Sequence, residues 1–349
     1  MTGHSHSHPA PDYRLVVNGQ DITAILNPRL IDLTLSEGRE GAVDSLDLRL
    51  ADHDGQLALP SQGATIALQL GWRGQPLVDK GTFTVDEVEH SGAPDELSIR
   101  ARSADLGHDA RRRNEKSWHD TTVGAIVSAV AARLKLKPRV GGALGKQRVE
   151  HIDQTNESDM HFMSRLAKRY DAVATVKKGC LLFLPINGTQ TSKGEALEPI
   201  TITRASGDQH RYHTAEREAY SGVRAYWGDV QKSKRRSVLA GTKQNEKRLK
   251  DTYATEADAM AAARAELQRI ERGKATFALT MALGNPAIMP QSPVTVAGFK
   301  PEIDGTTWLV KTVQHQLGDG GYTTQLEMER GGTDVGEGVV EDGSSPSDE

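Results

Sequence analysis

The stretch Phe83-x-Val85-x-x-Val88-x-His90 returns near the end of the chain as Trp308-x-Val310-x-x-Val313-x-His315, with the same spacing. Matching strand signals lie upstream of the two copies, Thr65-Ile66 in the first and Thr295-Val296 in the second. One more alternating strand follows each copy, marked by Leu97 and Ile99 and by Thr324, Leu326 and Met328. Any two β-strands share period-2 spacing, so coincidence is the alternative. We interpret the echo as two copies of one β-module.

The composition limits the class of protein. The 349 residues allow two or three domains, each with a core of its own. Hydrophobic residues make up 37% and aromatic residues 5%, which favours short strands with thin cores and burial completed by partner subunits. A net charge of −4 leaves no basic excess for a nucleic-acid backbone. The single cysteine, Cys180, excludes an internal disulfide and is interpreted as a small buried residue.

The N-terminal segment contains His4, His6 and His8, which alternate with small residues. This spacing could hold a metal weakly, but we favour a flexible arm over residues 1–11. No apolar run approaches the ~20 residues that span a bilayer, and no apolar core of a secretory signal is present. We therefore expect no membrane insertion, and synthesis and folding in the cytosol.

Residues 12–105 are typical of an antiparallel β-domain, a barrel or a sandwich. Apolar residues alternate with polar ones, which places them on one face of each strand. The alternating sets are Ile31, Leu33 and Leu35; Leu46, Leu48 and Leu50; and Ile66, Leu68 and Leu70. Gly-rich and Asp-rich turns separate these strands, as in an antiparallel barrel or sandwich.

Residues 106–190 change to a helical pattern and predict a small α/β domain. Asp120 or Thr121 is expected to cap a helix with one apolar stripe, which Pro138 and the following glycines end. A second helix is expected after Asn156 or Ser158. Strands are expected to resume at 172–176 and 180–184.

Within residues 191–330, strands are expected at 200–203, at 223–227 and over 275–330, with an Ala-rich helix at 255–272. Thr255 and Asp258 resemble a capping box at the start of this helix. The basic run at 231–236 is interpreted as a solvated loop tip. The acidic tail, 331–349, is rich in Gly and Ser and is predicted to be disordered.

The sequence contains no residues that we propose as catalytic, cofactor-binding or metal-binding. His151 and His161, with Asp153 and Asp159 nearby, match no metal-site spacing. Glu87 and Glu89 could be imagined as acid and base, but alternating charges on the wet face of a strand explain them better.

Two basic clusters, Arg111–Arg113 and Lys232–Arg236, suggest nucleic-acid binding as an alternative. They are short, lack interleaved aromatic residues and lie in an acidic chain, which favours solvated loops or an acidic partner.

From Tyr220 to Arg330 the sequence resembles the phage late control protein D family, the baseplate hubs of contractile tails and of R-type bacteriocins, related to the hub part of VgrG. Coverage extends more loosely to about residues 12–330. The matching stretches are Tyr220-Ser-Gly-Val-Arg-Ala-Tyr-Trp227, Thr252-Tyr-Ala-Thr-Glu-Ala257, Gln268-Arg-Ile-Glu-Arg-Gly273, Pro293-Val-Thr-Val-Ala-Gly-Phe-Lys300, Trp308-Leu-Val-x-x-Val313-x-His315 and Gly321-Tyr-Thr-Thr-Gln-Leu-Glu327.

The resemblance implies two tube-like antiparallel β-barrel domains, the first at 12–105 and the second at 191–330. It also implies a homotrimeric ring that joins the hexameric tail tube to the trimeric spike in a virion or tail-like particle, made and assembled in the bacterial cytoplasm. The expected partners are the spike, the tube, other baseplate proteins and a tape measure protein. No specific nucleic-acid binding and no enzymatic activity are expected. The alternatives are a tail-associated cell-wall hydrolase, as some related hubs carry, and a peptidoglycan-binding module at residues 117–187, which faintly resemble LysM.

Overall fold

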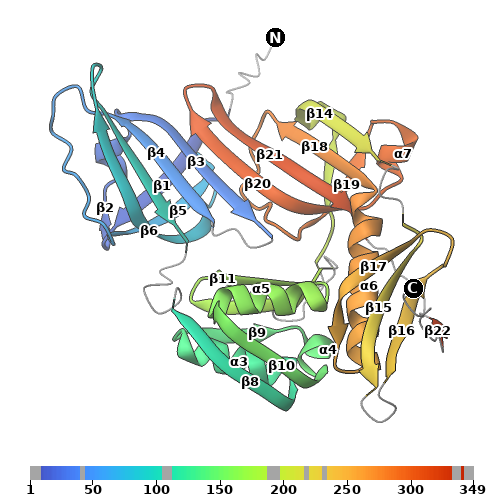
Figure 1. The fold of residues 1–349 in the computed structure, drawn as a ribbon. Helices are drawn as coiled ribbons and strands as arrows, with labels where there is room; N and C mark the ends of the chain where they lie inside the picture. Colours follow the sequence, from blue (N-terminus) through green and yellow to red (C-terminus); the bar gives the residue numbers. More distant parts are fainter. Residues whose placement is uncertain are drawn as a thin grey trace.

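The computed structural model describes residues 9–39, 44–103, 112–186, 197–215, 220–229, 234–331 and 339–341. The chain is mainly β, as predicted. Figure 1 shows two curled β-units side by side, with a small α/β unit and a separate sheet against a long helix beneath them. The two β-units share one 13-stranded sheet, so backbone hydrogen bonds between strands connect one unit to the other.

The first β-unit follows the predicted alternation of apolar and polar residues. Its strands pair in the order β3-β4-β7-β6-β5-β1-β2. The inward residues of β3 and β4, among them Leu33, Leu35 and Leu46, are fully buried. The elements are β1 (Pro11–Val17), β2 (Gln20–Asp21), α1 (Thr23–Leu26), β3 (Leu30–Gly38), β4 (Ser45–Ala51), β5 (Thr65–Trp72), β6 (Val78–Ser91) and β7 (Glu96–Arg102). Pro11, which we expected in a flexible arm, instead opens β1 because it pairs with Trp72.

The second β-unit has the same strand order as the first. Its strands pair in the order β14-β18-β21-β20-β19-β13, which matches β3-β4-β7-β6-β5-β1. The one difference is that β13 runs parallel to β19, whereas β1 and β5 are antiparallel. The elements are β13 (Ile200–Thr203), a 3₁₀ turn (Arg204–Ser206), β14 (Gly207–Thr214), β18 (Ala275–Met281), β19 (Pro293–Ala297), α7 (Pro301–Asp304), β20 (Trp308–Gly318) and β21 (Gly321–Arg330).

Two β-bulges recur at equivalent positions and confirm the predicted repeat. The β6–β7 ladder skips a residue between Val85 and Glu87, and the β20–β21 ladder skips one between Val310 and Thr312. A second pair of bulges follows Leu30 in β3 and Gly207 in β14. Independent strands with chance period-2 spacing would not share two bulges in matching ladders, since each bulge needs an extra residue at one place.

The first bulge explains the spacing of the repeated motif. Alternation buries Phe83 and Val85 in one copy and Trp308 and Val310 in the other. The extra residue shifts the phase, so the next inward position lies three residues on rather than two. Val313 is accordingly buried in the second unit.

The small α/β unit contains two of the predicted helices and differs from the prediction at their ends. Helix α3 is capped by Thr122, whose side chain accepts a bond from Ala125 N, and not by Asp120 or Thr121. The helix ends at Arg133. Pro138, which was expected to end it, lies instead in the following strand. The elements are β8 (Arg113–Thr122), α3 (Val123–Arg133), β9 (Lys137–Val140), α4 (Gly142–Gly145), β10 (Arg148–Ser158), α5 (Asp159–Arg169), β11 (Ala172–Lys177) and β12 (Cys180–Pro185). Helix α5 begins after Ser158, one of the two expected caps.

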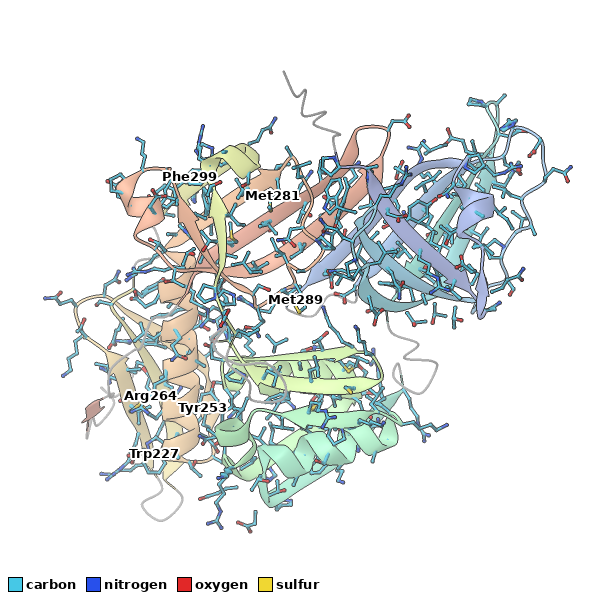
Figure 2. The ribbon with its side chains drawn as sticks, turned by 180° about the vertical axis from the view of Figure 1, so that it is seen from behind. Trp227, Tyr253, Arg264, Met281, Met289 and Phe299 are labelled. Carbon is cyan, nitrogen blue, oxygen red and sulfur yellow. The ribbon has the colours of Figure 1, made fainter. Side chains whose placement is uncertain are left out.

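A separate four-stranded sheet departs from the predicted second barrel. The strands between residues 222 and 253 do not join the β-units but pack with α6, whose Thr255 cap is confirmed. The elements are β15 (Gly222–Asp229), β16 (Lys234–Gly241), β17 (Glu246–Tyr253), α6 (Glu256–Gly273) and β22 (Val339–Glu341). Figure 2 shows Trp227 and Tyr253 on this sheet, and both pack against its small core. Since β22 pairs with β16, the prediction of a wholly disordered tail was wrong for residues 339–341.

Replacing Trp308 by alanine should lower the free energy of unfolding by roughly 3–5 kcal/mol. The side chain is fully buried, and its indole Nε1 donates to the carbonyl of Ile303 at 3.1 Å. Denaturant unfolding of Trp308→Ala measures the loss. Leu283→Ala is the control, because Leu283 is 56% exposed and its truncation should cost little. A loss below about 1 kcal/mol at Trp308 would contradict the equivalence of the two repeats.

Candidate functional site: a polar wall and the seam behind it

The candidate site is a polar wall formed by the outward residues of eight consecutive strands, β14-β18-β21-β20-β3-β4-β7-β6. In each strand the alternate residues fill a core, so the others share the opposite face of the sheet. The wall residues lining its two hollows include Asp32, Thr34, Ser36, Ser45, Asp47, Arg49, Glu87, Glu89, Ser98, Arg100, Gln209, Arg211, Thr280, Thr312, Gln314, Gln325 and Glu327. A sheet face that is polar over this length is suited to contact with water or a polar partner rather than to a core.

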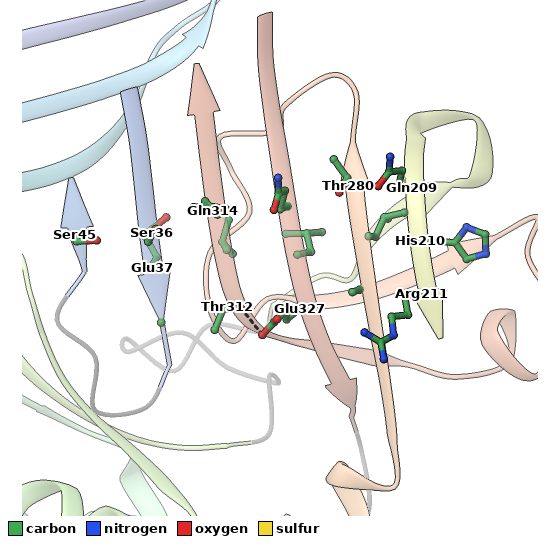
Figure 3. A pocket seen from close by; sticks show the side chains of 16 residues that line it. Ser36, Glu37, Ser45, Gln209, His210, Arg211, Thr280, Thr312, Gln314 and Glu327 are labelled. Carbon is green, nitrogen blue, oxygen red and sulfur yellow. Dashed lines mark hydrogen bonds between the residues drawn. The ribbon is translucent and has the colours of Figure 1, made fainter. Parts of the chain in front are cut away.

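The wall is hollowed where the two units meet. A hollow of about 540 Å³ spans β3, β4, β20, β21, β18 and β14. Figure 3 shows Gln314 and Thr312 on the central strand β20, with Ser36 on one side and Thr280, Gln209 and Arg211 on the other. Its polar groups are mostly Ser, Thr and Gln, with Arg211 and Glu327 among them, and they are spread across many strands. They do not converge on one point, which distinguishes the hollow from a compact catalytic pocket.

Charge is distributed unevenly along the wall. In the first unit, Arg49 pairs with Asp32 at 3.0 Å and with Glu96 at 2.8 Å. Arg100 pairs in the same way with Asp47 and Glu87, both at 2.8 Å. The second unit presents mostly Thr and Gln instead. The charges of the first unit therefore largely neutralise one another at the surface.

Behind the wall, the two units are joined by a seam between β20 and β3. Residues from Thr312 to Gly318 pair with residues from Gly38 to Asp32 in antiparallel register. Lys80 Nζ lies 2.6 Å from the Glu37 carboxylate, and both side chains are almost fully buried. Lys80 also donates to the carbonyl of Pro286 at 3.2 Å. A buried charge requires partners of this kind, since burial removes its water shell.

His315 completes the seam from β20. Its Nε2 lies 3.2 Å from Lys80 Nζ, and its Nδ1 lies 3.0 Å from both Thr324 Oγ1 and Tyr322 Oη. A lysine can only donate, so Nε2 accepts and the ring is neutral with its proton on Nδ1. The side chain is fully buried.

The seam shifts the pKa values of its members. Burial alone would raise the pKa of Glu37, but the charges of Lys80 and Lys177 outweigh it and lower the pKa to about 2. Burial lowers the pKa of His315, which agrees with a neutral ring. Burial also lowers the pKa of Lys80, although Glu37 opposes the shift.

A second buried cluster ties the α/β unit and α6 to the sheet. Arg272, from α6, contacts both oxygens of Asp171 and lies 2.7 Å from Glu329 of β21. Arg39, which follows β3, also pairs with Glu329 at 2.7 Å. From β11, Lys177 reaches Asp44 at 3.1 Å. These contacts fix the lower units against the β-units, and thereby fix the position of the wall.

Comparison with known proteins identifies the architecture. The family model described as phage tail baseplate hub (GPD) matches residues 43–321. A protein of Escherichia phage 186 described as a probable baseplate hub protein is 41% identical over 94% of this chain and 95% of its own length. Its counterpart in Escherichia phage P2 is 39% identical with the same coverage. The chain belongs to the phage tail baseplate hub (GPD) family. It is thus a structural hub component of the tail of a virion or tail-like particle, as the sequence predicted.

Solved structures of other tail proteins share the hub fold. The 43 kDa tail protein of prophage MuSo2 from Shewanella oneidensis has a TM-score of 0.68 at 15% identity, covering 91% of this chain and 98% of that one. A tail protein from Neisseria meningitidis MC58 has a TM-score of 0.67 at 14% identity, covering 91% and 96%. The E. coli c3393 protein, described as a component of the type VI secretion system, has a TM-score of 0.54 at 14% identity, covering 90% and 76%.

The histidines considered as metal ligands lie apart on the α/β unit of the hub. His151 contacts His119 and Asp153, each at 3.0 Å, whereas His161 contacts Glu157 at 2.7 Å. Among the described residues, no group of three His, Cys, Asp or Glu side chains could hold a metal ion. Residues His4, His6 and His8 lie outside the described residues.

The predicted surface charges are placed as follows. Glu87 pairs with Arg100 on the wall, and Glu89 lies beside it in the same strand. Arg112 and Arg113 are exposed, while Arg111 lies outside the described residues.

The second basic cluster and the cysteine require corrections. The prediction of a loop tip was wrong for Lys234–Arg236, which begin β16, because Arg235 and Arg236 stack over Tyr226 and Trp227. Lys232 and Ser233 lie outside the described residues. Cys180 is half-buried rather than buried, because it begins β12 next to a turn. Across the described residues, no helix is long and apolar enough to cross a membrane.

The sequence analysis did not predict that Glu37, Lys80 and His315 form a buried polar cluster. Glu37 was the detectable one, because it occupies an inward position two residues after Leu35. Lys80 gave no comparable signal, since its burial depends on a loop more than 200 residues away.

Lys80→Met should destabilise the protein by about 3–5 kcal/mol, because it removes the nearer cation of the buried Glu37 carboxylate and leaves only Lys177, at 3.5 Å. Denaturant unfolding at neutral pH measures the change. Lys178→Met is the matched control, since the Lys178–Asp79 pair is more than half exposed and should contribute less than about 1 kcal/mol. Equal losses in the two variants would contradict the role assigned to the seam.

Acidification should destabilise the protein in two stages. The lowered pKa of His315 means that the unfolded chain gains a proton first, so stability falls as pH drops below the ordinary value of 6.5. Glu37 adds a further loss between its ordinary 4.5 and about 2, at up to about 1.4 kcal/mol per pH unit. Urea unfolding from pH 8 to pH 3 measures both stages. His315→Gln should flatten the first stage alone, and a wild-type protein more stable at pH 5 than at pH 7 would refute the assignment.

Proposed function

We propose that three copies of this hub form a ring in which the polar wall lines a central channel, with the tail tube on one side and the spike on the other. The observation that carries the proposal is the continuity of the wall across two equivalent β-units. If each β-unit occupies one sector of a ring, the two units of a chain must present one continuous wall.

The duplication supports a trimer of chains. Each chain supplies two units of the same strand order, so three chains supply six sectors. Six sectors match the six-fold tail tube expected from the hub family, and three chains match a three-fold spike. Closed cyclic symmetry also stops growth once the ring is complete.

The chemistry of the wall suits a channel lining. Its Ser, Thr and Gln side chains are hydrated and uncharged, and Arg49 and Arg100 are paired with neighbouring carboxylates. Cargo passing such a surface meets water and weak hydrogen bonds rather than an apolar or strongly basic patch.

The proposed role is structural and not enzymatic. The polar groups of the hollow in Figure 3 do not converge, and the paired carboxylates of the wall are neutralised by arginine. Zymography on bacterial cell walls tests this part of the proposal, with a known lysozyme as positive control. Clearing by the purified hub would reject the purely structural role.

The ring should be visible as a solution mass. Three chains of 37.9 kDa make a particle of about 114 kDa. Size exclusion with light scattering measures this mass for the hub alone and for the hub mixed with its spike. A monomeric hub under both conditions would overturn the proposed ring.

A further inference from the structure

Two strand edges of the wall are unpaired at its opposite ends. Among the described residues, strand β14 pairs only with β18, and none of them pairs with its other edge. At the far end, the outer edge of β6 is covered by β5 only as far as Thr84 and by a loop at Val85. From Asp86 to Ser91 it makes no further backbone bond with any described residue. Open edges of this kind are templates for strand addition.

The internal repeat relates these two edges to the seam inside the chain. By the shared bulges, β6 is equivalent to β20, and β14 is equivalent to β3. In the seam, Gln314 lies opposite Ser36 and His315 lies opposite Leu35. The same register, moved to the open edges, places Glu89 opposite His213 and His90 opposite Tyr212.

We propose that β6 of one copy pairs antiparallel with β14 of the next copy in this register, which deepens the proposed ring by assigning its interface. Glu89 then lies opposite His213 of the neighbouring copy, and Ser91 lies opposite Arg211 of that copy. The inference rests on the proposed ring, which supplies the partner, a second copy of this chain. The register of the pairing is taken from the seam alone.

Charge on the two edges is complementary. The β6 edge carries the carboxylates of Glu87 and Glu89, and the β14 edge carries Arg211 with His213. Within the described residues, Glu89, Arg211 and His213 form no ion pair, although most other wall charges do. The proposed register brings the Arg211 side chain diagonal to Glu89, within reach of a long side chain.

Burial also points to these edges. Tyr212 is 37% exposed, whereas its equivalent in the seam, Leu35, is fully buried. The His90 side chain is 41% exposed, whereas its equivalent, His315, is fully buried. Each exposed residue occupies the position that the seam covers, so pairing with the next copy would cover both.

The pairing closes the wall into a barrel. Each chain supplies eight wall strands, and three chains supply 24. At about 4.8 Å per strand, this perimeter corresponds to a barrel roughly 37 Å across between backbones, before strand tilt widens it.

Disulfide trapping tests the register. The Cα atoms of directly opposed antiparallel residues are about 4.5–5.5 Å apart, within the range that a disulfide spans. In a Cys180→Ser background, Glu89→Cys with His213→Cys should give linked dimers and trimers on oxidation, which reducing agent returns to monomers. Each single cysteine variant, and Glu87→Cys with His213→Cys, should yield at least tenfold less linked product.

A second pair of variants covers the case in which the cysteines impair folding. Glu89→Lys should raise the dissociation constant of the trimer at least tenfold, because it faces Arg211 and His213. Adding Arg211→Glu should restore most of that loss, since the charges are exchanged. Both positions are exposed, so the circular dichroism spectrum should not change.

The outcomes separate this inference from the proposed ring. A trimeric mass with no linked product above the controls, and with no effect of charge exchange, overturns the register and leaves the ring intact. A monomeric mass with no linkage rejects both. Linkage at Glu89 and His213 with a trimeric mass supports both.

Discussion

The buried pair of Lys80 and Glu37 is the constraint on which the arrangement of this hub depends. Neither charge is stable inside a protein without its partner. Lys80 of β6 and Glu37 of β3 pair within the first unit, and Lys80 also reaches across the seam to His315 and to the carbonyl of Pro286 in the second unit. The ladder between β3 and β20 makes one sheet of the two β-units. The lower units are then fastened to the same sheet by Arg272 and Lys177. The polar wall is continuous because the buried contacts on the opposite face of the sheet hold the two β-units together.

Much of the local structure could be predicted from the sequence, because it depends on neighbours in the chain. The alternation in β3, β4 and β5 and the caps of α5 and α6 are set within a few residues. The repeated motif was detectable because its bulge imposes the same irregular spacing twice. The choice of sheet was not predictable for residues 222–253, since period two specifies a face and not a partner strand.

The two histidines of the repeated motif show the limit of equivalence. His90 and His315 occupy the same place in the same pattern, yet one is exposed and the other is fully buried. The difference lies outside both motifs, in whether another strand of the same chain covers the edge. Residue identity and spacing alone therefore could not distinguish a surface histidine from one that holds the units together.

Covalent fusion of the two units has a kinetic consequence for assembly. The seam within each chain forms between tethered partners, so it needs no bimolecular encounter. The proposed ring of six sectors then needs three bimolecular junctions instead of six. The junctions also differ in chemistry, because Thr214 replaces Glu37 at the equivalent position of β14. In the proposed ring, joints within a chain are permanent, whereas the proposed joints between chains carry no buried carboxylate at this position and can anneal until the ring is correctly closed.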